Sequence, residues 1–384
     1  MKKLIALLLT LALLMGMAIA PASAESKGKI LWLSNLNSGV QYEFYVAYWK
    51  MIAENLGYTF DVVYGDMSND PAGNLKQVKN AYTSDVKGII ISMDGGVVNI
   101  MDEYPDMWVV GFFSDMDSVF NDDGPSHDVM TREKFLGNMG DNYISGQALG
   151  EAYAAEVIAR GYKKVSTCIF PPFAYPKHTV ADASFRAAIA AYNETAAEPI
   201  EIVGDAEVLA FQPLSDSYFL EDGHDQIECI VGFCAGTTFI YPKIIEAKSM
   251  GFCRDDLQLI TGGFDNDADL LANCGDDGII VSLTIQGIES AIWPIAMLDA
   301  AISGNMYKDY PGPERMDSSV FNINSSAKFE TMINNSPLGP VMDVTKAQVS
   351  WDAMKDFFTS VNPDASYAEL TAFCQSFVVE GYTK

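Results

Sequence analysis

The sequence predicts an α/β protein built from two doubly wound lobes, each with a parallel sheet. Short apolar runs of strand length alternate with longer segments of helical length through most of the chain. Glycine or proline stands where several of these segments end or begin, as at Gly57 and Pro71. The alternation breaks once, in a polar stretch at 115–133, and then resumes. Alternation of this kind is typical of right-handed βαβ units, and two successive series of them predict two lobes.

The first series begins at Lys29 and supplies the first lobe. We expect a helix at 42–56 that ends at Gly57, and a second helix that begins at Asp70 and runs to about residue 83. The accompanying strands are expected at 30–33, 60–64, 88–92 and 107–113.

The second series follows the polar stretch and supplies the second lobe. It opens with a helix at 144–160 that ends at Gly161, and it contains further helices at 181–192 and 239–250. Its strands are expected at 165–170, 200–203, 227–233, 257–261 and 278–283. The last part of the chain is less regular, with helices expected at 288–302, 351–358 and 367–377.

The first 24 residues have the features of a secretory signal peptide. A basic start is followed by an apolar run and by Ala22-Ser23-Ala24, which fits cleavage after Ala24. An uncleaved membrane anchor is the alternative. No cysteine ends the apolar run, so a lipid attachment is not expected. We therefore expect an exported protein, periplasmic or at the cell surface.

Charge and composition exclude several classes of function. The formal net charge of −27 argues against a nucleic-acid partner, which needs clustered Lys and Arg. The three histidines are scattered without zinc-site spacing, and no G-x-S-x-G element is present, so we expect neither an enzyme nor a metal or other cofactor. The six cysteines allow either disulfides or buried free thiols.

Five stretches follow one another in the order and at the spacings of a known family. They are Ser34-Asn35-Leu36-Asn37-Ser38, Asp66-Met67-Ser68-Asn69-Asp70-Pro71-Ala72, Gly140-Asp141-Asn142 with Gly146, Gly263-Phe264-Asp265, and Thr284-Ile285-Gln286. Together they resemble the type I periplasmic-binding-protein family, the ribose-binding-protein-like sugar-binding proteins of ABC importers. The resemblance covers about residues 29–305.

The resemblance implies two Rossmann-like lobes joined by a multi-strand hinge that close over a ligand. It places residues 27–142 and 287–306 in the N-terminal lobe and residues 143–286 in the C-terminal lobe. Residues 307–384 would form a hinge return and a C-terminal extension that the sequence does not assign to a lobe.

The implied function is capture of a small polar ligand, most readily a sugar, by a monomer that delivers it to an ABC transporter permease in the membrane. The alternatives are a chemosensory receptor of the same fold that signals to a membrane kinase, and a binder of a non-sugar ligand such as a nucleoside.

The resemblance also implies site residues in the first lobe and at the end of the second. Asp265 and Gln286 match ligand-binding positions of the family, and Tyr42 lies near its stacking aromatic residue, with Phe44 and Tyr45 as competitors. The remaining candidates follow strands of the first lobe: Asn35, Asn37, Asp94 and Asp115.

The second lobe departs from the family pattern. The family's arginine is absent from the stretch 170–179, where His178 or Lys177 is the candidate replacement, and Phe173 is a further candidate as an added aromatic residue. The family's asparagine after the next strand is also absent, and Thr237 is the candidate donor there. The aromatic residues added in this lobe favour a flatter or more apolar ligand than a simple pentose or hexose; they are Phe170, Phe173, Tyr175 and Phe233.

Asp265 has two other interpretations. It could cap the helix that follows, or it could belong to a calcium loop, since residues 265–269 read D-x-D-x-D. The calcium interpretation lacks the turn glycine that such a loop requires, because Leu270 stands in its place.

Overall fold

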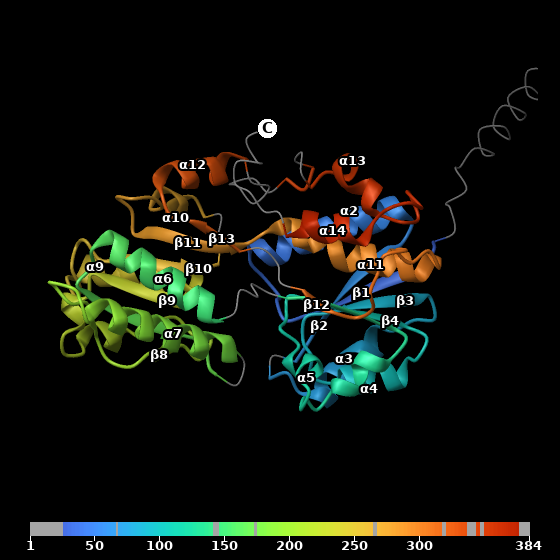
Figure 1. The fold of residues 1–384 in the computed structure, drawn as a ribbon, viewed down its shortest axis with the longest axis horizontal. Coiled ribbons are helices and arrows are strands. Elements are labelled where there is room, and N and C mark those ends of the chain that lie inside the picture. Colours follow the sequence, from blue (N-terminus) through green and yellow to red (C-terminus); the bar gives the residue numbers. More distant parts are fainter. Residues whose placement is uncertain are drawn as a thin grey trace, which may run out of the picture.

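The protein folds into two lobes, each built on one mostly parallel sheet with helices on both faces (Figure 1). The computed structural model describes residues 26–66, 68–140, 146–172, 175–263, 267–316, 320–335, 343–345 and 349–375. The predicted signal peptide, 1–24, lies outside these residues. Among the described residues, no helix has both the length and the apolar character needed to cross a membrane.

Lobe 1 is built on a six-stranded sheet in which every pairing is parallel. In spatial order its strands are β12 (Arg315–Met316), β5 (Phe135–Met139), β4 (Trp108–Phe112), β3 (Val86–Ile91), β1 (Lys29–Ser34) and β2 (Thr59–Tyr64). Its helices are α2 (Val40–Leu56), α3 (Pro71–Ala81), α4 (Val97–Glu103), α5 (Asp117–Phe120) and the 3₁₀ turn η1 (His127–Thr131).

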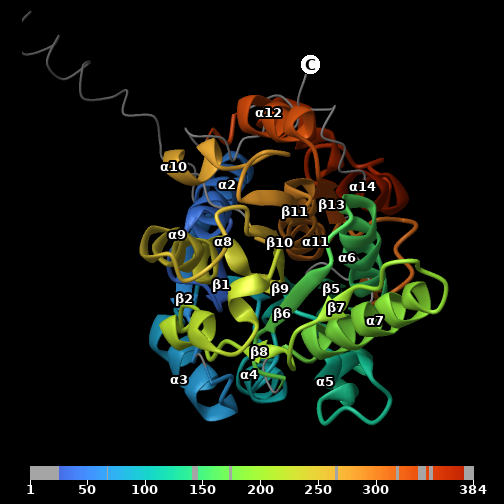
Figure 2. The ribbon, with the colours of Figure 1, turned by 90° about the vertical axis from the view of Figure 1, so that its left-hand side faces the viewer.

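Lobe 2 repeats this arrangement on a seven-stranded sheet. In spatial order its strands are β13 (Val320–Ile323), β11 (Ile280–Gln286), β10 (Gln258–Gly262), β9 (Cys229–Ala235), β6 (Lys164–Ile169) and β7 (Glu201–Ile202), and β8 (Glu207–Val208) also pairs with β6. Its helices and 3₁₀ turns are α6 (Gly146–Arg160), α7 (Pro176–Asn193), η2 (Asp216–Leu220), η3 (His224–Gln226), α8 (Gly236–Phe239), α9 (Tyr241–Met250), α10 (Ala268–Ala272) and α12 (Ser326–Asn335). Figure 2 looks onto this lobe, with α9 to the left of its strands and α6 and α7 to the right.

The two sheets share one topology. In lobe 1, β2 lies outside β1, and β3, β4 and β5 follow on the other side. In lobe 2, if the short strand β8 is set aside, β7 lies outside β6, and β9, β10 and β11 follow on the other side. This is the doubly wound order, which places a switch point between the first and third strands. The prediction of two doubly wound lobes is confirmed.

Local sequence explains several helix boundaries. Asp70 caps α3, because its carboxylate accepts a hydrogen bond from the Gly73 N–H at 2.7 Å, and Pro71 occupies the first turn. Gly57 ends α2 in the left-handed conformation, with φ 89°, which glycine adopts without strain. Both boundaries agree with the prediction.

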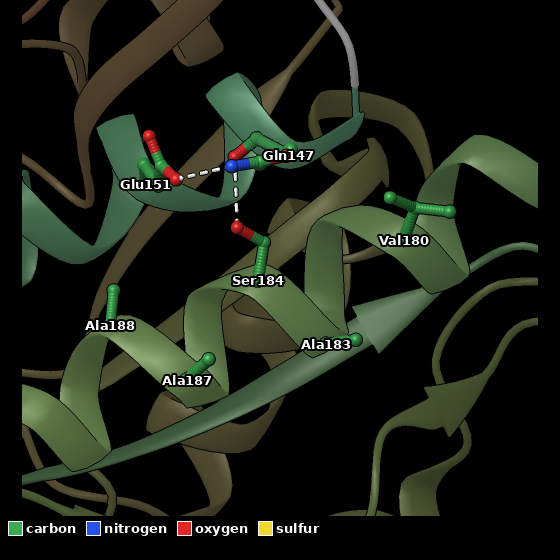
Figure 3. A pocket seen from close by; sticks show the side chains of 7 residues that line it. All are labelled: Gln147, Glu151, Val180, Ala183, Ser184, Ala187 and Ala188. Atoms are coloured by element: carbon green, nitrogen blue, oxygen red, sulfur yellow. Dashed lines mark hydrogen bonds between the residues drawn. The ribbon is translucent and has the colours of Figure 1, made fainter.

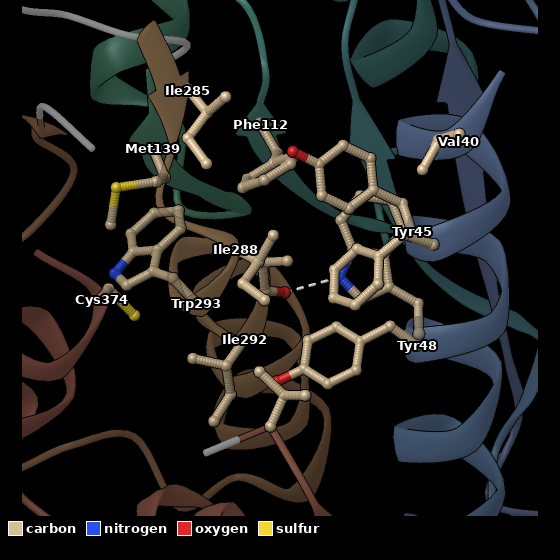
Figure 4. Packing of buried hydrophobic residues seen from close by; sticks show 14 of the residues in the cluster. Val40, Tyr45, Tyr48, Phe112, Met139, Ile285, Ile288, Ile292, Trp293 and Cys374 are labelled. Carbon is tan, nitrogen blue, oxygen red and sulfur yellow. Dashed lines mark hydrogen bonds between the residues drawn. The ribbon is translucent and has the colours of Figure 1, made fainter. Parts of the chain in front are cut away.

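The segment that returns from lobe 2 forms the centre of the lobe 1 core. The 3₁₀ turn η4 (Ile288–Ala291) leads into α11 (Ile292–Ser303), which packs against α2 and the sheet. Figure 4 shows Ile288 and Ile292 beside the rings of α2, with Trp293 on their other side next to Met139 and Cys374. Trp49 on α2 donates its indole N–H to the carbonyl of Ala291 at 2.6 Å, so the return is fixed by a buried hydrogen bond as well as by apolar contact.

The end of the chain contributes to both lobes. β12 joins the sheet of lobe 1, whereas β13 runs antiparallel to β11 in lobe 2. Ser326 at the start of α12 hydrogen-bonds Asp276 of lobe 2. The last elements, α13 (Trp351–Met354), η5 (Lys355–Phe357) and α14 (Tyr367–Cys374), contact α2, η4 and α11 of lobe 1. The predicted boundaries of 27–142 with 287–306, 143–286 and 307–384 stay a prediction.

Some sequence expectations differ from the structure. The helix expected at 351–358 ends after Met354 and continues as a 3₁₀ turn, and the helix expected at 367–377 ends at Cys374. The polar stretch at 115–133 holds α5 and η1. The strand β5 and the helix α4 were not assigned from the sequence, because their apolar runs are short. All six cysteines are free thiols, which decides between the two alternatives.

Candidate ligand-binding site

The carboxyl ends of the central strands define the candidate site. In open α/β sheets the loops after the first and third strands separate at the switch point and leave room for a ligand. In lobe 1 these loops follow β1 and β3, and in lobe 2 they follow β6 and β9. The predicted candidates Asn35, Asn37, Asp94, His178 and Thr237 all lie in or just after these loops.

Asp94 lies half-buried after β3, next to the switch point of lobe 1. Its carboxylate accepts a hydrogen bond from the side-chain amide of Asn69, with 2.8 Å between Nδ2 and Oδ1. Asn69 belongs to the loop between β2 and α3, so two loops of the lobe meet at this carboxylate. Its orientation is therefore set by the protein before any ligand arrives.

Asp115 follows β4, the strand next to β3, and is partly buried. Burial, together with the nearby carboxylates of Asp117 and Asp94, raises the pKa of Asp115 to about 6, against the opposing charge of Lys177. Lys177 lies on α7 of lobe 2. The two lobes are thus close enough at this point for their charges to interact.

The second carboxylate of this loop, that of Asp117, is paired with Arg315. Its guanidinium bonds Asp117 at 2.6 Å and also donates to the backbone carbonyl of Asp115 at 3.1 Å. The residue before the loop, Phe113, has a left-handed backbone with φ 60°, which is costly for an aromatic residue. The loop that presents Asp115 is therefore held in an uncommon conformation by contacts around it.

Tyr42 forms part of an aromatic group at the same edge of lobe 1. Its ring stacks on Trp32 of β1 with 5.8 Å between ring centroids, and its hydroxyl lies 2.6 Å from that of Tyr64 at the end of β2. Burial and this hydrogen bond raise the pKa of Tyr42 to about 12. Tyr64 is 51% exposed, so the pair offers an aromatic surface to solvent. The competitors Phe44 and Tyr45 are buried in the core.

The asparagines after β1 differ from each other. Asn37 is exposed, and its side-chain oxygen accepts a hydrogen bond from Ser38 at 3.2 Å. The side-chain oxygen of Asn35 is buried and has no hydrogen-bond partner among the described residues. A buried acceptor without a partner is costly, so Asn35 is the better candidate for a ligand contact.

Lobe 2 presents a cluster of rings at the end of β6. Phe170 is 7% exposed and contacts Tyr175, His178, Phe211 and Phe239, with centroids 5.2 to 5.7 Å apart. His178 is 6% exposed and stacks on Tyr175, and its Nδ1 accepts the Phe170 N–H at 3.4 Å. Burial and the neighbouring Lys177 lower the pKa of His178 to about 3.

The ligand-binding role of His178 stays a prediction, and with its lowered pKa the imidazole would contact a ligand in its neutral form. A neutral, buried imidazole that supports the ring cluster cannot act as a cationic donor. Lys177, its neighbour in sequence, supplies the positive charge on this side.

Thr237 is 2% exposed on α8, the short helix that follows β9. Its hydroxyl would lie 3.3 Å from a Cβ atom at Gly263, so a side chain there would crowd it. The neighbouring Gly236 N–H donates to Thr261 on β10. Thr237 therefore lies where the ends of β9 and β10 approach each other.

Three predicted site residues are not tested by the structure. Asp265 and Phe173 lie outside the described residues, and so does the side chain of Gln286, the last residue of β11. One alternative for Asp265 has lost its basis, because Asp267 caps α10 by accepting hydrogen bonds from the N–H groups of Asp269 and Leu270.

Sequence reasoning missed two supporting residues, Asn69 and Tyr64. Asn69 was quoted only as part of a motif, and Tyr64 only as the end of a strand. Their positions just after or at the end of β2 were visible, but their contacts with Asp94 and Tyr42 join residues 25 and 22 positions apart, respectively.

A surface groove of about 400 Å³ lies elsewhere, between α6 and α7 of lobe 2 (Figure 3). Gly150 allows α6 to approach the α7 backbone closely, since a Cβ atom there would collide with it. Ser184 donates to the Gln147 carbonyl across the groove at 3.0 Å. The groove is lined by Gln147, Glu151, Val180, Ala183, Ser184, Ala187 and Ala188.

Comparison with known proteins identifies the fold. No protein-family model and no curated protein matches the chain. Among solved structures, a carbohydrate transporter solute binding protein from Agrobacterium radiobacter, in complex with D-arabinose, matches with a TM-score of 0.57 at 15% identity over 80% of this chain and 99% of its own. The chain has the fold of a type I periplasmic binding protein.

Two further structures with this periplasmic-binding-protein fold agree. An ABC transporter solute binding protein from Burkholderia graminis, also in complex with D-arabinose, has a TM-score of 0.57, 16% identity and coverage of 78% of this chain and 96% of its own. A glucose-galactose binding protein from Geobacillus stearothermophilus has a TM-score of 0.54, 16% identity and coverage of 77% and 97%. About a fifth of this chain lies outside each of these similarities.

Proposed function

We propose that the protein is an exported solute-binding protein of an ABC importer, which captures a small sugar-like ligand between its two lobes and delivers it to a membrane permease. One observation carries the proposal. Each lobe has an equivalent switch point, and next to these points Asp115 of lobe 1 lies within electrostatic reach of Lys177 of lobe 2. The similar structures in complex with D-arabinose support a sugar as the ligand class.

The chemistry of the described residues fits such a ligand. Lobe 1 offers carboxylate and amide oxygens as acceptors for hydroxyl groups, and lobe 2 offers ring surfaces for the apolar faces of a sugar. Binding would work by lobe closure, because a ligand that contacts both lobes stabilises the closed arrangement by its differential affinity. We place Asp265 and Gln286 in the same cleft as further ligand contacts.

A thermal-shift screen tests the proposal directly. Purified mature protein is heated with D-arabinose, D-xylulose, D-tagatose, D-glucose and D-galactose, and separately with nucleosides. A ligand at about one hundred times its Kd stabilises a protein by roughly 2.7 kcal/mol, so a true ligand should raise the Tm by several degrees. A shift with nucleosides alone would replace the sugar assignment, and no shift with any compound would contradict it.

A further inference from the structure

Two loops of lobe 1 are joined by a single asparagine. Asn69, in the loop between β2 and α3, donates through Nδ2 to the Asp94 carboxylate at 2.8 Å. Its Oδ1 accepts the backbone N–H of Gly95 at 2.9 Å. One side-chain amide thus holds both the side chain of Asp94 and the backbone that follows it.

The backbone around this amide leaves little freedom. Asn69 has a left-handed φ of 56°, and a Cβ atom at Gly95 would collide with the Asn69 carbonyl oxygen, so the two loops touch. Asn74, which is fully buried on α3, donates to the Gly95 carbonyl at 2.9 Å and to the Asn69 Oδ1 at 3.3 Å. The position of the Asn69 amide is therefore fixed from several sides.

Asp94 keeps one oxygen available in this arrangement. The Asn69 amide occupies Oδ1, and in the part of the chain that the structure describes Oδ2 has no hydrogen-bond partner. Asp94 also lies at the switch point and within electrostatic reach of Asp115, whose loop meets the charge of Lys177 from lobe 2. Asp94 Oδ2 therefore lies at the edge of lobe 1 that approaches lobe 2.

We propose that Asn69 is a positioning residue of the binding site, which fixes Asp94 so that one carboxylate oxygen accepts a hydroxyl group of the ligand. This inference rests on the proposed function and deepens it, because it makes Asp94 with Asn69 a determinant of which sugar is bound. A sugar without a hydroxyl at this position would leave a desolvated carboxylate oxygen without a partner, and the site would reject it.

The variant Asn69→Asp changes one feature of the contact. The new carboxylate still accepts the Gly95 N–H, but the donor to Asp94 is lost and a like charge stands in its place. The probe is whichever of the five sugars shifts the wild-type Tm most, and its Kd is measured by calorimetry. We expect the variant to bind at least about tenfold more weakly near pH 7, because two adjacent carboxylates repel each other. Asn55→Asp, the same change at an exposed site on α2, should leave the Kd unchanged.

A pH profile separates positioning from a general structural defect. Two adjacent carboxyls share a proton at lower pH, so Asn69→Asp should regain most of its affinity near about pH 5, relative to wild type at that pH. The variant leaves other charged groups of this region unchanged: Asp66 and Asp70 on the loop that carries residue 69, Asp115 after β4, and Lys177 of lobe 2. An affinity loss that is equal at all pH values would overturn the positioning role.

The exchange Asn69→Asp with Asp94→Asn tests the role of the carboxylate itself. It restores an amide–carboxylate hydrogen bond between the loops with donor and acceptor reversed, so the Tm should return toward wild type. Binding should stay weak, since residue 94 would no longer present a carboxylate. Wild-type affinity in the double variant, or in Asn69→Asp near pH 7, would overturn the inference alone. If none of the five sugars binds the wild-type protein, the proposed function fails and the inference fails with it.

Discussion

The two lobes share one strand order yet present different chemistry at the same structural position. After β3 and β4, lobe 1 presents carboxylates whose surroundings are built by hydrogen bonds, as in the Asn69–Asp94 contact. After β6, lobe 2 presents the ring cluster around Phe170, with a buried, neutral histidine inside it. Under the proposed function, the shared topology would fix where a ligand is held, and the loop residues of each lobe would decide which of its groups is recognised.

This asymmetry has a physical consequence for closure. The carboxylates of lobe 1 and the ring cluster of lobe 2 would not compete for the same groups of a ligand, so a molecule with hydroxyls on one edge and an apolar face could satisfy both at once. Lys177 and Asp115 add a charge interaction between the lobes. A mixed ligand of this kind would bind best only in the closed arrangement.

The largest effect is expected from Asp265→Ala, which should abolish binding. Its carboxylate is predicted to accept ligand hydroxyls, and its loss should leave the fold intact because Asp267 caps α10. The matched control is Asp267→Ala, which should cost about 1 kcal/mol of stability and spare binding. Calorimetric titration and thermal unfolding of both variants measure the two effects. Unchanged affinity in Asp265→Ala would remove this carboxylate from the site.

The apolar side of the comparison is tested by Phe170→Ala. The side chain is buried among four rings, so its truncation should lower the free energy of unfolding by about 3 kcal/mol and weaken binding.

Tyr42→Phe is the counterpart in lobe 1. It keeps the stacking on Trp32 and removes only the hydrogen bond to Tyr64, so the free energy of unfolding should fall by less than about 1 kcal/mol. Denaturant unfolding measures the loss of free energy of unfolding in both variants. Equal losses in Phe170→Ala and Tyr42→Phe would contradict the expected order of the two effects.

Asp115 should make stability depend on pH. Its pKa in the folded protein is raised to about 6, above the usual value, so the folded state binds a proton more readily than the unfolded state. Stability should therefore fall as pH rises from about 4 to about 6, by on the order of 1 to 2 kcal/mol after solvent screening, and then level off. Asp115→Asn should remove this part of the profile. A variant whose pH profile matches wild type would show that Asp115 does not titrate in this range.

The smallest effect is expected from Lys177→Met. The variant keeps the long aliphatic chain and removes the charge that faces Asp115, so the pKa of Asp115 should rise further. The free energy of unfolding should fall by less than about 1 kcal/mol in this variant, because charges near solvent are screened. Affinity measured at low and high salt should become less salt-dependent than in wild type. An unchanged salt dependence would mean that the two lobes do not interact through this charge.

Some features of the protein follow from local sequence alone. Apolar runs such as Ile30 to Leu33 form fully buried strands wherever helices cover both faces of a sheet, so their position could be predicted. The Asp70–Pro71 start of α3 and the glycine end of α2 depend on backbone groups within one turn, and both were predicted correctly. The alternation of strands and helices was sufficient to predict two doubly wound lobes.

The sequence determined the fold class and the loops that hold the candidate residues, because both depend on contacts between near neighbours in the chain. Only the tertiary structure decided which side chains in those loops are charged, buried or held. Burial in the ring cluster lowers the pKa of His178, and that cluster includes Phe211 and Phe239 from later in the chain. Asp94 is oriented by a residue 25 positions earlier. Interactions between segments far apart in sequence set the burial and the electric field at each group, and neither can be read from the residue type.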